Sequence, residues 1–179
     1  MGKMVEIWLV AWIVLTALTL AFVTFNLRYP IKYKDEIIKL AALNNLPPSF
    51  VASVINCESG FNKDAKSNVG AIGLMQLLPA TAEFIKNKYN LKLDVANLCD
   101  VKTNITLGCA YLNYLSSKFY DKFTLLCAYN AGEGNVIQWL ANKKYSLDGE
   151  KLQTTPFPST NHYAAKVIKD EKIYKKFFV

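Results

Sequence analysis

Residues 47–60, PPSFVASVINCESG, predict one amphipathic helix with a clear start and a clear end. Pro48 suits the first helical turn, where its missing N–H breaks no hydrogen bond, and Gly60 suits the position that ends a helix. Along one face, the spacing i, i+3, i+4, i+7 holds three aliphatic side chains and then a carboxyl, in the order Val51, Val54, Ile55, Glu58. The carboxyl of Glu58 is therefore expected to point into the protein.

The predicted place of Glu58 favours its protonated form. Burial among apolar side chains and the partial negative charge at the C-terminal end of the helix both disfavour a carboxylate, so we expect a raised pKa. A carboxyl that stays protonated near neutral pH is what a general acid needs, and cleavage of a glycosidic bond often relies on such a group. The alternative is a buried glutamate that pairs with one of the many lysines.

Helical patterns continue from residue 30 to the end of the chain. Apolar residues recur at steps of three and four, clusters of Pro, Gly and Asn separate the runs, and the alternation typical of strands is scarce. Besides the helix that Gly60 ends, we expect helices at about 35–43, after Pro79, and at about 104–120, 123–130, 136–142 and 162–176. A stripe in one of them is predicted to face the core: Ile105, Gly108, Leu112, Leu115 and Phe119. The fold class is therefore mainly α, with a single compact helical domain.

Two glycine-containing stretches indicate places where the backbone turns or approaches a ligand. Residues 67–76, SNVGAIGLMQ, hold two glycines too close together for an undisturbed helix. Residues 128–135, AYNAGEGN, end a helix with Tyr129 and Asn130, whose side chains can hydrogen-bond a polar ligand. Capping and packing are an equal alternative for these two residues.

Composition and charge narrow the class of protein. The 179 residues are 52% hydrophobic and 20% charged, which excludes a disordered chain and a protein built only of membrane spans. Lys and Arg number 21 against 14 Asp and Glu, and the net charge of +7 favours an anionic partner. The bases occur singly or in short pairs, so we expect no nucleic-acid binding.

Cysteine and histidine content predicts no metal site. The four cysteines, Cys57, Cys99, Cys109 and Cys127, include no C-x-x-C pair, and His162 is the only histidine. Cys57, Cys109 and Cys127 lie in apolar helical patterns and are expected to be small buried hydrophobes in preference to disulfide partners. The pairing itself stays open at this point.

The N-terminus carries a predicted membrane segment. Residues 7–25 contain no charged side chain and are about long enough to cross a bilayer as a helix. We therefore divide the chain into an anchor, residues 1–29, and a main domain, residues 30–179. A cleaved signal peptide is the rival interpretation. More Lys and Arg follow the segment than precede it, which taken alone would place the main domain in the cytoplasm.

Four ordered motifs and a closing segment resemble one known family. They are residues 58–62 (ESGFN), 70–82 (GAIGLMQLLPATA), 104–112 (NITLGCAYL) and 128–132 (AYNAG), followed by 156–163 (PFPSTNHY). In order and spacing they resemble the lytic transglycosylases of the soluble-lytic-transglycosylase type. The resemblance extends from about residue 35 to the C-terminus.

The resemblance implies a goose-lysozyme-like helical domain that cleaves the β-1,4 bond between N-acetylmuramic acid and N-acetylglucosamine in peptidoglycan. The product would carry a 1,6-anhydromuramoyl end. It implies that Glu58 is the single catalytic acid and base and that no cofactor takes part. The residues that it implies for the glycan cleft are Ser67, Gln76, Tyr129 and Asn130, with Tyr163 near the reacting sugar and Ser59 and Leu78 as weaker candidates.

Two positions depart from the family pattern. The closing segment usually has a glutamate where this chain has Ser159 and a basic residue where it has Asn161, so weaker or altered activity is expected. The alternative functions are a lysozyme-like hydrolase and a glycan-binding module without catalysis. On the favoured hypothesis the chain is a monomer anchored in the cell membrane, with its main domain on the cell-wall side.

Overall fold

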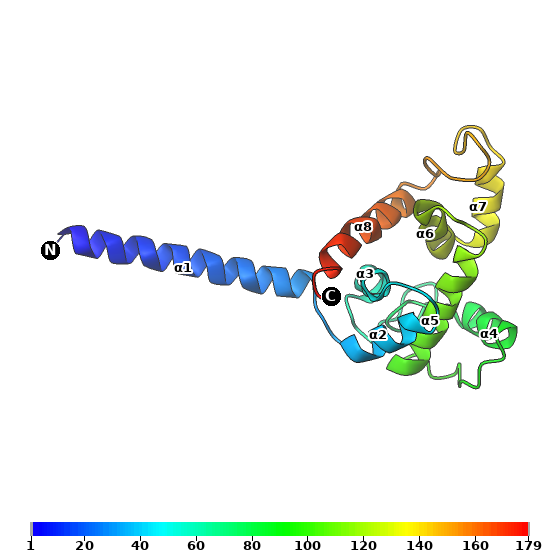
Figure 1. Ribbon diagram of the computed structural model, residues 1–179, viewed down its shortest axis with the longest axis horizontal. Helices are drawn as coiled ribbons and strands as arrows, with labels where there is room; N and C mark the ends of the chain where they lie inside the picture. The colour runs from blue at the N-terminus through cyan, green and yellow to red at the C-terminus, as the bar shows by residue number, and fades with distance from the viewer. Residues whose placement is uncertain (1, 179) are drawn as a thin grey trace. The chain divides into compact units, whose positions relative to one another are not determined.

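In residues 2–178, which the computed structural model describes, the regular structure consists of eight α-helices and isolated β-bridges (Figure 1). The helices are α1 (Gly2–Arg28), α2 (Lys34–Ala42), α3 (Pro48–Ser59), α4 (Pro79–Lys88), α5 (Val101–Ser116), α6 (Lys122–Ala131), α7 (Glu133–Leu140) and α8 (Pro158–Tyr174). The chain divides into two compact units, residues 1–31 and 32–179. The predicted mainly α class is confirmed.

The first unit is a single apolar helix, α1. Its segment Met4–Arg28 has 25 residues and a mean hydropathy of 2.3. Large apolar side chains such as Trp8, Trp12 and Phe22 lie exposed along it. By length and composition this helix suffices to cross a bilayer, and a signal sequence would share both properties.

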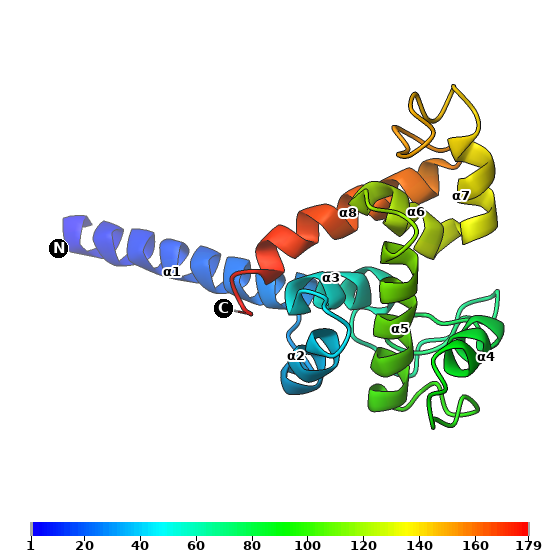
Figure 2. The same ribbon diagram turned by 45° about the vertical axis from the view of Figure 1, so that its right-hand side comes forward.

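The second unit is built around two sets of helix contacts. Helix α8 packs against α3 and α6, and α5 contacts α2, α4 and α6 (Figures 1 and 2). The inward face predicted for α3 is fully buried at Val51, Val54 and Ile55. The stripe predicted for the core is also buried, at Ile105, Gly108, Leu112, Leu115 and Phe119. These buried faces hold the helices together by removing apolar surface from water.

Prolines, aspartates and a glycine mark the helix boundaries. Pro48 and Pro79 occupy the first turns of α3 and α4, and Gly60 ends α3 in the left-handed conformation, with φ of 58°. Asp100 and Asp121 cap α5 and α6. Each of these carboxylates accepts a hydrogen bond at 2.8 Å from the backbone N–H three residues further on.

Three predicted helix ranges were wrong at their ends. Helix α5 begins and ends earlier than the predicted 104–120, because its aspartate cap sets the start. Helix α7 begins before the predicted 136–142, since Gly132, with φ of 90°, makes the whole turn between α6 and α7. Helix α8 begins before the predicted 162–176, because Pro158 opens its first turn.

The segment between α3 and α4 is a compact loop folded onto α5. At Gly73, which has φ of 81°, a Cβ would lie 2.3 Å from the side-chain nitrogen of Asn104 and 2.4 Å from the carbonyl oxygen of Leu98. Buried Asn104 donates to the Leu98 carbonyl and accepts from the Met75 N–H, both at 2.8 Å. The close approach predicted for this glycine is therefore with the protein's own chain, whereas Gly70 faces open space.

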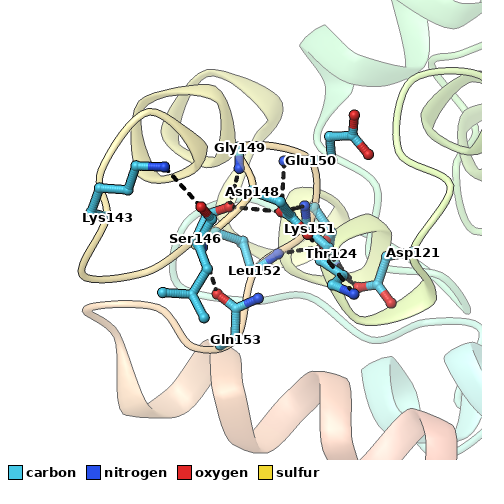
Figure 3. A network of polar contacts seen from close by, with 11 residues as sticks. Asp121, Thr124, Lys143, Ser146, Asp148, Gly149, Glu150, Lys151, Leu152 and Gln153 are labelled. Carbon is cyan, nitrogen blue, oxygen red and sulfur yellow. Dashed lines mark hydrogen bonds and ion pairs between the residues drawn. The ribbon is translucent and has the colours of Figure 1, made fainter.

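The connection between α7 and α8, residues 141–157, is ordered by its own polar contacts (Figure 3). Asp148 accepts hydrogen bonds from the backbone N–H groups two and three residues further along, at 2.9 and 3.0 Å. The N–H of Leu152 donates to the hydroxyl of Thr124 in α6 at 2.9 Å. The connection is thereby fixed to α6.

Candidate active site

A cleft of about 370 Å³ opens in the second unit, and the predicted catalytic carboxyl lines it. The walls come from α3, the loop before α4, and parts of α4, α5 and α6. The lining residues are Glu58, Ser67, Val69, Ala71, Gln76, Leu77, Leu78, Thr81, Tyr111, Tyr129, Asn130, Ala131 and Gly132. Six of the eight predicted site residues are thus brought together in one cleft.

The last turn of α3 presents Glu58 to the cleft from an apolar base. Three residues of the same helix face are fully buried beneath it. Burial raises the pKa of the Glu58 carboxyl from an ordinary 4.5 to about 7. Near neutral pH the group can therefore both give and take a proton, which is the property expected from the sequence.

Tyr163, in α8, brings its phenol close to Glu58. Interaction with this hydroxyl lowers the pKa of Glu58 and so partly offsets the effect of burial. The hydroxyl oxygen is itself buried and has no hydrogen-bond partner at normal geometry among residues 2–178. Desolvation raises the pKa of Tyr163 well above its usual range, so the phenol stays protonated. A polar atom of a ligand beside Glu58 would satisfy this hydroxyl.

Gln76 and Ser67 are positioned by hydrogen bonds within the loop. The side-chain N–H groups of Gln76 donate to the carbonyls of Gly73 at 2.9 Å and Ala65 at 3.2 Å. Its side-chain oxygen is the atom left for a ligand. The hydroxyl of Ser67 accepts from the N–H of Ala71 at 3.0 Å and keeps its own hydrogen to donate.

Tyr129 and Asn130, at the end of α6, have different roles in the cleft wall. The hydroxyl of Tyr129 donates to the Met75 carbonyl at 2.8 Å, and its ring lies 5.2 Å from the ring of Tyr111. Tyr129 therefore ties α6 to the loop as well as lining the cleft. The side-chain oxygen of Asn130 accepts from the Thr160 hydroxyl at 2.8 Å, which leaves its N–H groups to donate.

Two of the predicted residues do not line the cleft. Ser59 donates its hydroxyl to the Leu74 carbonyl at 2.8 Å, so it fastens α3 to the loop. Tyr163 lies outside the lining set and reaches the site only through its hydroxyl beside Glu58. Leu78 does line the cleft and is 42% exposed.

Sequence reasoning did not single out Thr81, Tyr111 and Thr160 as site residues. Thr81 and Tyr111 line the cleft, and Thr160 orients Asn130. All three lie inside the quoted motifs, at 70–82, 104–112 and 156–163, so the motifs were the available signal.

The four cysteines are free thiols. Cys109 and Cys127 are buried, as predicted, and burial raises the pKa of each to about 12. Cys57 differs from the prediction because it is half-buried and faces a polar pair on α8, with its sulfur 3.0 Å from the Lys166 nitrogen and 3.8 Å from Asp170. Within residues 2–178, no group of three or more metal-ligating side chains is close enough to hold an ion.

The second unit is all-helical, with a half-buried glutamate at an open cleft, and its fold is that of the lysozyme-like class of proteins. Within that class, the chain belongs to the Transglycosylase SLT domain family, which it matches over residues 35–152. The predicted family and the predicted lysozyme-like fold are both confirmed.

Individual relatives agree with this assignment. The chain is 32% identical over 154 residues to the soluble lytic murein transglycosylase of Escherichia coli K12, with 84% of this chain and 24% of that protein covered. It is 30% identical over 167 residues to membrane-bound lytic murein transglycosylase C of Histophilus somni, with 80% of this chain and 46% of that protein covered.

Solved structures show the same domain. An inactive glutamate-to-glutamine mutant of the lytic transglycosylase Slt from Pseudomonas aeruginosa matches with a TM-score of 0.75 and 31% identity, over 85% of this chain and 25% of that one. The 70-kDa soluble lytic transglycosylase of Escherichia coli matches with a TM-score of 0.73 and 30% identity, over 84% and 25%. The chain thus spans about a quarter of the length of these soluble relatives.

Proposed function

We propose that this chain is a lytic transglycosylase that cleaves the glycan strands of peptidoglycan. The observation that carries the proposal is Glu58, a half-buried carboxyl with a pKa of about 7 at the cleft of a domain of this family. The names of the relatives support it, because several are lytic murein transglycosylases. One solved relative with glutamate replaced by glutamine is described as inactive.

The proposed mechanism needs only one carboxyl. Protonated Glu58 gives its proton to the oxygen that leaves when the β-1,4 bond breaks. The resulting carboxylate then removes the proton from the C6 hydroxyl of the muramic acid, which closes on C1 and forms the 1,6-anhydro ring. Because this nucleophile is already part of the sugar, it has a large advantage over water, and a second carboxyl is unnecessary. Glu58 is the only carboxyl among the cleft-lining residues of the described chain.

Polar groups around Glu58 would hold the reacting sugar. The N–H groups of Asn130 and the hydroxyl of Ser67 are donors, and the side-chain oxygen of Gln76 is an acceptor. The buried hydroxyl of Tyr163 is placed to donate to a ligand atom next to Glu58 as charge develops.

The decisive experiment identifies the product. Full-length chain in detergent is incubated with purified peptidoglycan, and released muropeptides are analysed by mass spectrometry. We expect anhydro ends, one water lighter than reducing ends. They should be absent with Glu58→Gln and present with Glu150→Gln, which removes an exposed carboxyl of the 141–157 connection.

The other outcomes identify the rival functions. Reducing ends that disappear with Glu58→Gln would mean a lysozyme-like hydrolase. Binding to peptidoglycan without release would mean a glycan-binding module. Either result contradicts the proposal.

We also propose that the protein acts in the cell envelope, with α1 as its anchor and the main domain on the cell-wall side. The apolar Met4–Arg28 segment supports this location, as does the relative named membrane-bound. The excess of Lys and Arg after the segment opposes it. A reporter fused to the C-terminus should be active outside the cytoplasm, and activity only inside would contradict this topology.

A further inference from the structure

A second hollow, of about 420 Å³, lies beside the cleft and shares two lining residues with it. Thr81 and Tyr111 line both, so the hollow adjoins the cleft. Its other lining residues come from α4, α5 and α7 and are Ala80, Phe84, Tyr114 and Glu133.

The hollow has an aromatic wall. The ring of Phe84 meets that of Tyr114 edge-on, with centroids 5.3 Å apart. Phe84 is 46% exposed, so much of this aromatic surface is open to a ligand. An apolar group placed against it would remove exposed ring area from water.

Two lysines flank that wall, and only one of them forms a salt bridge. The Lys118 nitrogen lies 4.6 Å and the Lys88 nitrogen 5.1 Å from the centroid of the Tyr114 ring. Lys118 forms a salt bridge with Glu133, which also accepts a hydrogen bond from the Tyr114 hydroxyl at 2.8 Å. Exposed Lys88 takes part in no salt bridge among residues 2–178. Lys88 does not itself line the hollow and acts on Glu133 only through space, so Lys88, Lys118 and Glu133 together give this wall a net charge of +1.

These features suit a peptide better than a sugar. The sugars of peptidoglycan carry no net charge where the lactyl group is amide-linked to its peptide, so they offer Lys88 no ionic partner. The peptide stems carry carboxylates and short apolar side chains. They also project sideways from the glycan, so a stem on a sugar bound near Tyr111 can reach a hollow that adjoins the cleft.

We propose that this hollow binds a peptide stem of the substrate, with Lys88 holding a stem carboxylate and the exposed ring of Phe84 contacting an apolar part. The inference rests on the proposed function, because it takes peptidoglycan as the ligand of the cleft. The hollow would then be a second recognition element, which binds the peptide independently of the sugar backbone.

The test compares two ligands that differ only in stem charge. Soluble tetrasaccharide fragments with native stems, and the same fragments with their stem carboxylates converted to amides, are titrated into full-length Glu58→Gln chain in detergent. We expect the native fragment to bind about tenfold more tightly, as suits one charge-assisted contact. Adding Lys88→Gln should abolish that ratio, and Lys88→Glu should invert it.

A matched control and a second variant separate charge from shape. Lys169→Gln removes an exposed lysine of α8 outside both hollows and should preserve the tenfold ratio. Phe84→Ala should weaken both stem-bearing fragments and leave their ratio intact.

Each remaining outcome contradicts the proposal that the hollow binds a peptide stem. The proposal is wrong if the chain with Lys88 intact binds the native and the amidated fragment equally well. It is also wrong if Lys88→Gln leaves the ratio of the two affinities unaltered, or if neither fragment binds. The proposed function is judged separately by the mass of the products, so the two can fail independently.

Discussion

Burial of Glu58 gives the carboxyl its proton affinity and also weakens the folded state above neutral pH. Folding raises the pKa of this group from 4.5 to about 7, so the native chain binds the proton more tightly than the unfolded chain does. The resulting stabilisation is complete below pH 4.5 and is lost as pH rises through about 7. Above neutral pH the charged carboxyl therefore destabilises the folded chain.

Replacing Glu58 by glutamine should stabilise the protein at alkaline pH. At pH 8 we expect a gain of about 2 kcal/mol in the free energy of unfolding, less than the full pKa shift implies because the carboxyl is partly exposed. Below pH 4.5 the wild type and the variant should have similar stabilities. Urea unfolding of both chains at several pH values measures this, and equal stability at pH 8 would contradict the raised pKa of Glu58.

The rate of cleavage should follow the protonated fraction of Glu58. Above pH 7, kcat/KM is expected to fall about tenfold per pH unit, because the leaving oxygen then finds no proton. Tyr163→Phe should move this alkaline limb to higher pH, since the phenol lowers the Glu58 pKa. Initial rates from pH 5 to 9 measure both effects, and a flat profile between pH 7 and 9 would refute the assigned acid.

At the scale of whole elements, local sequence signals predicted the boundaries that depend on neighbouring residues. Pro48, Pro79 and Gly60 act within one turn, so their effects follow from the chain alone. The start of α7 was missed because a glycine pair suggested a turn, whereas Gly132 completes the turn and Gly134 is already helical. Single-residue turns between packed helices depend on tertiary contacts that no local pattern contains.

The site was predictable where a motif lies on one element and less so where several elements meet. Glu58 follows from the apolar face of α3, but neighbouring Ser59 points to the Leu74 carbonyl, a contact set by how the loop folds back. The hollow around Phe84, Tyr114 and Glu133 was not predicted at all. Its residues come from three helices that only the folded chain brings together.

Two glycines of the same loop provide a matched test of its packing. Both have φ near 80°, so alanine at either should cost about 1–2 kcal/mol in backbone strain. Gly73→Ala should cost about 2 kcal/mol more than Gly70→Ala, because only its Cβ would overlap Asn104 and the Leu98 carbonyl. Thermal unfolding measures the difference, and equal destabilisation would contradict the tight contact with α5.

Ser159, exposed in the first turn of α8, tests the departure from the family pattern. Ser159→Glu should add about 0.5 kcal/mol of stability from the helix dipole. It should also raise turnover several-fold if the family glutamate assists catalysis. Ser159→Gln, of similar size without charge, is the control. Turnover that stays constant in both variants would mean that position 159 takes no part in the reaction.

At the scale of the whole molecule, the second unit contains every cleft residue and its own buried core. Removing residues 1–31 should therefore leave a folded domain with unchanged kcat/KM on soluble glycan fragments. Membrane fractionation should find the full chain with the membrane and the shortened chain in solution. Loss of cooperative unfolding in the shortened chain would contradict this independence.

Helix α8 follows every other element of the cleft in the sequence, and this order bears on how the cleft assembles. Its residues Thr160 and Tyr163 orient Asn130 and adjoin Glu58, and the helix packs against α3 and α6. A nascent chain that has emerged only as far as α7 already carries Glu58 but lacks the phenol beside it and the helix that covers α3. The cleft is therefore complete only after α8 has been made and has packed against α3 and α6.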